Sequence, residues 1–98
     1  MNHSLENNKL TIFLEGEINS YNSDVVEKEL DGIISQNEFK SLVLDFEKLH
    51  YTSSAGLRII VMLKQRYDDL TLVRVPDGVF DVFEMVGLPN LIKIERLK

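Results

Sequence analysis

Cysteine is absent from the 98-residue sequence, which excludes disulfides, thiolate metal sites and cysteine nucleophiles. Long apolar runs are absent too. The longest one, residues 59–63, is far shorter than the ~20 residues that a membrane-spanning helix needs. The first eight residues contain neither a basic segment nor an apolar one, so no signal peptide is expected. These absences predict a cytoplasmic protein with no direct membrane insertion.

Positive charge is also scarce. Sixteen acidic side chains outnumber eleven basic ones, which gives a formal net charge of −5. The basic residues are scattered, and no three of them are adjacent in the sequence. Proteins that bind nucleic acid need a basic patch to displace counterions from the phosphates. The charge pattern therefore disfavours nucleic acid and anionic membranes, and it leaves a protein or a small ligand as the partner.

The balance of apolar and charged side chains is that of a folded domain. Apolar residues make up 44% and charged residues 28% of the chain, which is typical of globular rather than disordered proteins. A chain of this length fits one domain with a modest core. We expect a flexible N-terminus over residues 1–8 and a single domain over residues 9–98.

Apolar periodicity alternates between the strand and helix patterns along the chain. A period of two predicts strands, and spacings of three and four predict helices. The expected strands are residues 9–15, 41–46, 70–75 and 91–94, and the expected helices are residues 24–36, 57–67 and 79–86. Gly16 is expected to form a bulge or tight turn, after which residues 17–18 continue the sheet. The fold class is therefore α/β, with a mixed, mostly parallel sheet.

Several segments between these elements carry turn and cap residues. Residues 47–52 are expected to form a loop. Asp77 is expected to cap the third helix at its N-terminus, and Gly87 is expected to end that helix, with Leu88 packing back onto its last turn. The second helix has few polar positions in its first two turns. We therefore expect it to be enclosed by the sheet and by a neighbour or a partner.

A serine hydrolase is the first catalytic alternative to test. Such a site would recruit Ser54, His50 and either Asp45 or Asp24. The nucleophile-elbow pattern G-x-S-x-G is not met, because Thr52 stands where its first glycine should be. A histidine four residues before its serine would also have to double back across a turn. We therefore expect no catalytic residues and no enzymatic activity.

Metal and nucleotide motifs are missing as well. The pair Asp68 and Asp69 is explained by a charged turn, and the glycines are isolated rather than arranged in a phosphate-binding loop. We expect no metal site and no cofactor.

Two adjacent serines, Ser53 and Ser54, stand where a loop ends and the second helix begins. One reading is that one of them caps the helix, because serine is strongly preferred at that position. The other is that a serine here carries a phosphate, which adds about −1.5 to −2 of charge. A helix N-terminus favours an anion by about 0.3–1 kcal/mol, so such a modification would leave the fold intact. The residues alone leave both possibilities open.

Three segments resemble one known family. Residues 44–58 are similar to the signature of STAS domains, and specifically to that of the bacterial anti-sigma factor antagonists. Residues 14–19 resemble the "L-x-G-E-L/I-D" segment of the family, and residues 79–88 resemble the end of its third helix. The segments occur in the family's order and span nearly the whole chain. The resemblance implies a single STAS-like domain with the order strand, strand, helix, strand, helix, strand, helix, strand.

The resemblance also implies a function. In these proteins the unphosphorylated form binds an anti-sigma factor that is also a serine kinase, the kinase phosphorylates one serine, and a PPM-type phosphatase restores binding. Aligned on Gly56 and Leu57, the phosphoacceptor is Ser54. Ser53 replaces the aspartate of the family motif and is a competing acceptor, and Ala55 replaces its second hydroxyl residue. The family's additional C-terminal helix is expected to be shortened or absent, which would leave a flank for a partner or for self-association.

The contact surface that the resemblance implies combines one loop with the start of the second helix. Its residues are Asn19, Ser20, Tyr21, Ser53, Ala55, Gly56, Leu57 and Arg58. Tyr21 is an aromatic anchor in this hypothesis, and the alternative is that it packs on its own domain. For Arg58 the alternative is an ordinary solvated arginine. Two other functions stay open: a STAS scaffold in a lipid-transport or stress-sensing assembly, and a nucleotide-binding module.

Overall fold

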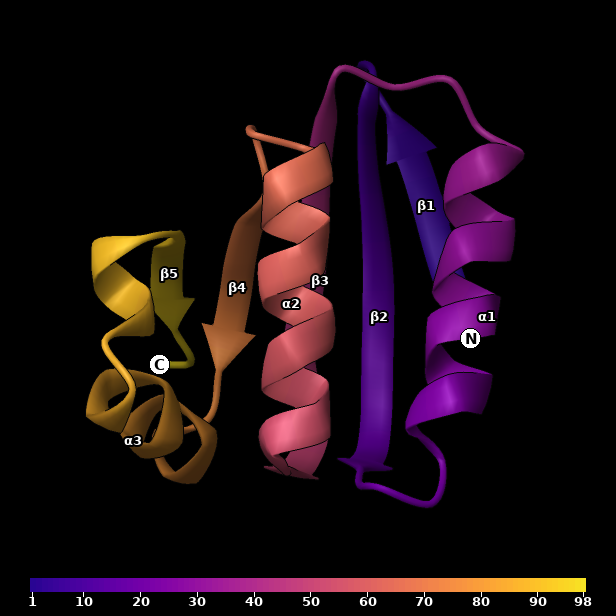
Figure 1. Cartoon of the computed structure of the whole chain (residues 1–98). Coiled ribbons are helices and arrows are strands. Elements are labelled where there is room, and N and C mark those ends of the chain that lie inside the picture. The colour runs from indigo at the N-terminus through magenta and orange to yellow at the C-terminus, as the bar shows by residue number, and fades with distance from the viewer.

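Five strands form one sheet in the computed structural model, which describes all 98 residues (Figure 1). The strands are β1 (Asn2–Glu6), β2 (Lys9–Ile18), β3 (Ser41–Thr52), β4 (Thr71–Val75) and β5 (Lys93–Arg96), and they neighbour one another in this order. β1 runs antiparallel to β2, and the other neighbouring pairs are parallel. The expected mixed, mostly parallel sheet is confirmed.

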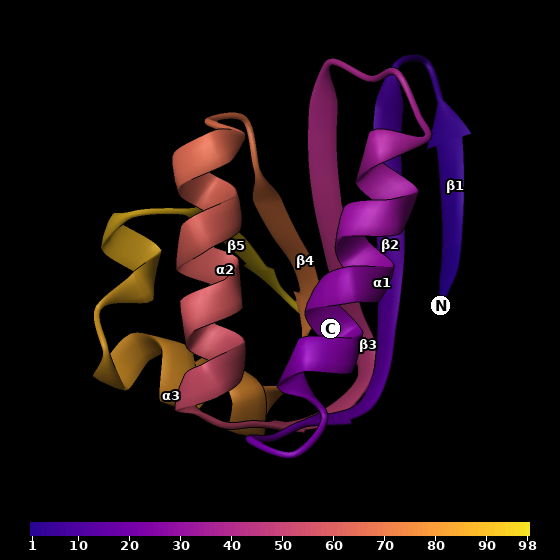
Figure 2. The same ribbon diagram turned by 45° about the vertical axis from the view of Figure 1, so that its right-hand side comes forward.

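Helices pack on one face of this sheet. They are α1 (Ser23–Ser35), α2 (Ser54–Arg66), α3 (Asp77–Met85) and the short 3₁₀ turn η1 (Leu88–Asn90). α1 and α2 lie over the same face in both views, and α3 and η1 lie beside α2 (Figures 1 and 2). The predicted element order is confirmed, and no helix follows β5. None of the helices combines the length and the apolar character that crossing a lipid bilayer requires.

The core lies between the sheet and these helices. Alternate residues of β2, such as Leu10 and Ile12, are fully buried beneath the helices. Phe46 of β3 meets Phe83 of α3 edge to face, with ring centroids 5.5 Å apart, a favourable geometry for aromatic rings. No helix covers the opposite face of the sheet. The apolar periodicity of the strands thus places one face in the core and leaves the other open.

The prediction of a flexible segment over residues 1–8 is wrong, because Asn2–Glu6 form the edge strand β1. This strand pairs with β2 along its whole length, from Asn2 opposite Phe13 to Glu6 opposite Lys9. The N-terminal amine also lies 3.4 Å from a carboxylate oxygen of Glu29 on α1. The segment is therefore part of the domain.

The prediction of a loop over residues 47–52 is also wrong, because β3 continues to Thr52. The register with β2 shifts between Phe13 and Glu15 and again between Gly16 and Glu17. Gly16 has φ +80°, in the left-handed region that favours glycine, so the expected bulge is confirmed. With these irregularities the two strands stay paired as far as Ile18 and Thr52.

Smaller differences concern the ends of helices and strands. α2 begins at Ser54, as the serine pair indicated and one turn before the start at residue 57 that the apolar periodicity gave. Pro76, not Asp77, is the N-cap of α3, and Asp77 instead pairs with Arg96 at 2.8 Å. Gly87 has φ +75° and follows the C-cap, as predicted. Leu88 is buried, but η1 intervenes, so the last strand begins at Lys93 rather than residue 91.

Candidate functional site

The two segments predicted to bind a partner meet at one edge of the sheet. β2 and β3 end side by side there, and the loop after β2 and the start of α2 follow directly (Figure 2, lower edge). The backbone N–H of Ser53 donates a hydrogen bond of 2.9 Å to the carbonyl of Ile18. We call residues 19–22 and 51–58 the carboxyl edge. Ligands of parallel α/β sheets commonly bind at this end of the strands.

The loop of residues 19–22 is held by its own side chains. The Asn19 Oδ1 atom accepts hydrogen bonds from the backbone N–H groups of Tyr21 (2.8 Å) and Asn22 (3.0 Å). Asn22 accepts one from the N–H of Asn19 (2.8 Å) and donates one to the Glu17 carbonyl (2.9 Å). Tyr21 projects from this network with 96% of its surface exposed, so it does not pack on its own domain. The loop presents Tyr21 from an ordered backbone.

The two serines have different positions. Ser53 is the N-cap of α2, and its Oγ accepts a hydrogen bond of 3.2 Å from the N–H of Ala55. Its carbonyl accepts from the N–H groups of Gly56 and Leu57. Ser54 is the first residue of the helix, is exposed, and forms no capping bond. The capping role that the sequence left open between the two serines therefore belongs to Ser53.

Ser53 should accordingly contribute to stability more than Ser54 does. We expect Ser53→Ala to lower the free energy of unfolding by about 0.5–2 kcal/mol, since the Ala55 N–H loses its partner. Ser53→Asp should keep most of the stability, because an aspartate also caps. Urea unfolding of these variants and of Ser54→Ala measures the difference. Equal losses for Ser53→Ala and Ser54→Ala would contradict the assignment of the cap.

Gly56 is fixed by the closeness of β2 and β3 to the helix. A Cβ atom at this position would lie 2.1 Å from the Thr52 Oγ1 atom and 3.2 Å from the Ile18 Cγ2 atom. The backbone here is helical rather than left-handed, so the glycine is required by space and not by its φ angle. Gly56 thus brings the start of α2 against the ends of both strands.

The remaining predicted contact residues lie along the start of α2. Ala55 and Leu57 are half-buried, whereas Arg58 is exposed. Sequence reasoning did not single out Tyr51, which is 51% exposed. Tyr51 pairs with Glu17 in the sheet, which places it at the carboxyl edge. Its position directly before the Thr-Ser-Ser segment was the available signal.

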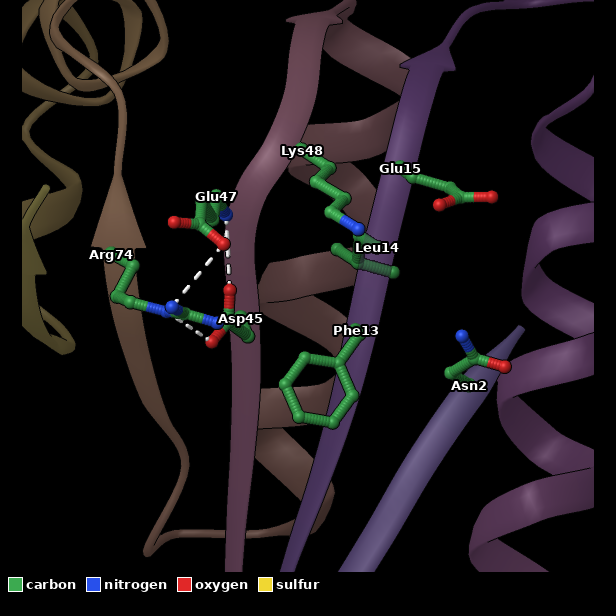
Figure 3. Close-up of a pocket in the computed structure, with 8 residues that line it drawn as sticks. All are labelled: Asn2, Phe13, Leu14, Glu15, Asp45, Glu47, Lys48 and Arg74. Carbon is green, nitrogen blue, oxygen red and sulfur yellow. Dashed lines mark hydrogen bonds and ion pairs between the residues drawn. The ribbon is translucent and has the colours of Figure 1, made fainter.

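The open face of the sheet carries a separate cluster of charges (Figure 3). Asp45 is almost fully buried and accepts hydrogen bonds from the Arg74 Nε atom (2.7 Å) and the Glu47 backbone N–H (3.0 Å). Arg74 also lies 3.2 Å from a carboxylate oxygen of Glu47. The hydrogen bond to Asp45 and the charges of both carboxylates raise the pKa of Arg74 above its ordinary value. Arg74 holds this geometry with φ +51°.

This cluster accounts for Asp45, one of the two aspartates named for the hydrolase alternative. Asp45 binds Arg74 rather than a histidine, and it lies on the open face of the sheet (Figure 3). The cluster borders a hollow of about 290 Å³ on the open face. The structure contains no group of three or more histidines, aspartates or glutamates placed to hold a metal ion. The carboxyl edge, where the two predicted contact segments meet, is the candidate functional site.

Comparisons with known proteins identify the family. The STAS domain model matches residues 3–97. The anti-sigma-B factor antagonist of Listeria monocytogenes is 31% identical over 93 residues, which cover 91% of this chain and 81% of that protein. An anti-sigma factor antagonist from Mycobacterium paratuberculosis shares the fold, with a TM-score of 0.84 at 14% identity, over 96% of this chain and 82% of that one.

A third similar structure is the anti-sigma factor antagonist SpoIIAA of Bacillus. Its unphosphorylated form matches with a TM-score of 0.71 and 19% identity, over 95% of this chain and 87% of that one. Its phosphorylated form matches with a TM-score of 0.63 and 18% identity, over 95% and 90%. At these identities the solved structures establish only a shared fold. Membership of the family is shown by the family model and by the Listeria relative. The chain belongs to the STAS domain family.

Proposed function

We propose that this protein is an anti-sigma factor antagonist that changes partners when Ser54 is phosphorylated. Without phosphate it binds an anti-sigma factor that is also a serine kinase. The kinase transfers the γ-phosphoryl group of ATP to the Ser54 Oγ atom, and the complex then dissociates. A PPM-type phosphatase hydrolyses the phosphoserine and restores binding. The observation that carries the proposal is the division between the serines: Ser53 caps the helix, so the exposed Ser54 hydroxyl is free for modification.

The electrostatics of the helix start support this role. A phosphate on Ser54 would lie in the first turn of α2, which contains no acidic residue. The partial positive charge of a helix N-terminus stabilises an anion there. Phosphorylation would therefore change the charge of the carboxyl edge while the helix stays folded. The similarity to anti-sigma factor antagonists, one of which (SpoIIAA) has been solved in its unphosphorylated and phosphorylated forms, supports this proposal.

The test is to capture partners from the lysate of the protein's own host. Immobilised wild type, Ser54→Ala and Ser54→Asp are compared, and bound proteins are identified by mass spectrometry. We expect wild type and the alanine variant to capture an ATP-binding kinase with anti-sigma activity, and the aspartate variant to lose it. Equal capture by all three variants, or capture of no such kinase, would reject the proposal.

Tyr21 offers a second test that separates binding from folding. We expect Tyr21→Ala to weaken binding of the captured kinase by roughly 5- to 30-fold, as for a tyrosine at the centre of an interface. The midpoint of thermal unfolding should stay nearly unchanged, because 96% of the side chain is already exposed. Tyr21→Phe is the control for the ring without the hydroxyl. Unchanged affinity in Tyr21→Ala would place the interface elsewhere.

A further inference from the structure

An apolar groove runs along α2, on the side that faces α3 and η1. Its volume is about 620 Å³, and its apolar lining comprises Leu57, Val61, Met62, Val86, Leu88 and Leu91. Val86 and Leu91 are 57% and 62% exposed, although they are large apolar side chains. Contiguous exposed apolar surface of this kind marks an interaction site.

The groove begins at the proposed phosphorylation site. Ser54 and Arg58 line it in the first turns of α2, and Gln65 lines it in the last turn. Residues at these spacings share one face of a helix. Gln65 lies eleven positions after Ser54, so the groove extends for about 16 Å at ~1.5 Å per residue. A partner that contacts Ser54 can therefore extend along the groove without a break.

The charge of the groove differs from that of the rest of the surface. The chain has sixteen carboxylates, yet none of them lines this groove. The hollows on the open sheet face and beside α1 each contain at least two. Three of the four arginines, Arg66, Arg74 and Arg96, form ion pairs within the chain. Arg58 forms none, and it stands at the groove.

We propose that this groove receives an amphipathic helix of the anti-sigma partner, with a carboxylate of that helix paired to Arg58. An apolar channel of about three helical turns fits apolar side chains at i, i+3/i+4 and i+7 of a bound helix. The unpaired cation at one end fixes the direction of that helix, since a bidentate arginine–carboxylate pair is both strong and directional. The inference rests on the proposed function and names the chemistry of its partner surface.

The same geometry links the groove to the switch. Ser54 and Arg58 are four residues apart on α2, a spacing at which side chains of opposite charge pair on a helix. A phosphate on Ser54 would compete with the partner's carboxylate for Arg58. It would also place a dianion at the mouth of the groove, facing that carboxylate. Release of the partner then has two additive causes at one end of the groove.

Affinity measurements test the groove with the purified kinase that wild type captures. Arg58→Glu and Leu91→Lys change exposed side chains on opposite walls, so both variants should fold. We expect each to weaken binding roughly tenfold or more. Lys40→Glu and Leu5→Lys are matched controls that make equal changes at exposed positions outside the groove and the carboxyl edge, and they should bind as wild type does.

A crosslinking experiment identifies what occupies the groove. Because the chain contains no cysteine, Leu91→Cys carries a single benzophenone label, and Leu5→Cys is the control. We expect crosslinks from residue 91 to a helical segment of the kinase that contains apolar residues at helical spacing and an acidic residue. Crosslinks to a second copy of this chain, or none while the kinase is bound, would overturn the inference.

The possible results distinguish a failure of the groove inference from a failure of the proposed switch at Ser54. If Ser54→Asp abolishes binding while Arg58→Glu and Leu91→Lys bind as wild type does, the proposed function stands and the groove inference is wrong. If Ser54→Asp binds as wild type does, the proposed switch itself is wrong. Loss of binding in all three variants, with both controls unaffected, supports both.

Discussion

Gly56→Ala is expected to lower the free energy of unfolding by about 1–3 kcal/mol, the usual cost of forcing an extra methyl group into a packed site. For a domain of this size each kcal/mol corresponds to a fall of about 4–8 °C in Tm. The new Cβ atom would lie 2.1 Å from the Thr52 Oγ1 atom. Thr52 is buried, and its hydroxyl donates a hydrogen bond to the Ser53 carbonyl, so it cannot move aside freely. The helix start must shift instead.

Two further variants test whether the loss of stability comes from the close contact between residue 56 and Thr52. Gly32→Ala in α1 is the matched control, because a Cβ atom there would meet nothing within 4 Å. It should be neutral or should stabilise by up to ~1 kcal/mol, as alanine favours a helix over glycine. Thr52→Ala combined with Gly56→Ala removes the closest contact and should recover part of the loss. Thermal unfolding in which Gly56→Ala matches Gly32→Ala would contradict the steric argument.

The elements that bury a face were predictable from the sequence, and the edge strand β1 was not. β2 shows the period of two because the buried residues Leu10, Ile12 and Leu14 alternate with less buried ones on the other face. In β1 no residue is fully buried, so its side chains carry no periodic pattern. The strand is specified by backbone pairing with β2, and any sequence without proline can make such bonds.

The second half of β3 was missed for a related reason. Glu47 and Lys48 are both exposed, which breaks the alternation that identifies a strand. The register with β2 is irregular in the same region, so Leu49 and Thr52 are buried at a spacing of three rather than two. A bulge changes the spacing without ending the strand. Sequence periodicity therefore ended the strand too early.

Only part of the candidate site could be predicted from the sequence. The pattern at Ser53 and Ser54 placed both serines at a helix start. Which of them caps the helix depends on which side-chain oxygen reaches the Ala55 N–H, and backbone geometry decides this.

The groove along α2 was anticipated in part, because the second helix has few polar positions in its first two turns and was expected to be enclosed. Its other wall comes from Val86 and Leu91. Only the packing of α3 and η1 brings these residues to α2.

If the proposed function holds, phosphorylation of Ser54 is expected to weaken binding of the proposed kinase partner by roughly 30- to 4,000-fold, which corresponds to about 2–5 kcal/mol. A dianion at the interface would lose its hydration and face the partner without a new cation, and both effects oppose the complex. Ser54→Asp carries a single negative charge and should fall near the lower limit. Isothermal titration of wild type, Ser54→Ala, Ser54→Asp and the phosphorylated protein measures the series.

The same charge should leave the fold unharmed, and this distinguishes a switch from simple damage. Ser54 is exposed and makes no capping bond, and a negative charge in the first turn stabilises a helix by about 0.3–1 kcal/mol. Ser54→Asp should therefore unfold at or slightly above the wild-type temperature while losing its partner. Ser53→Asp should also stay folded, since aspartate is a good cap, and it tests whether charge one residue away has the same effect. If binding falls in Ser54→Asp only in proportion to a fall in Tm, the loss reflects unfolding, and Ser54 has no switching role.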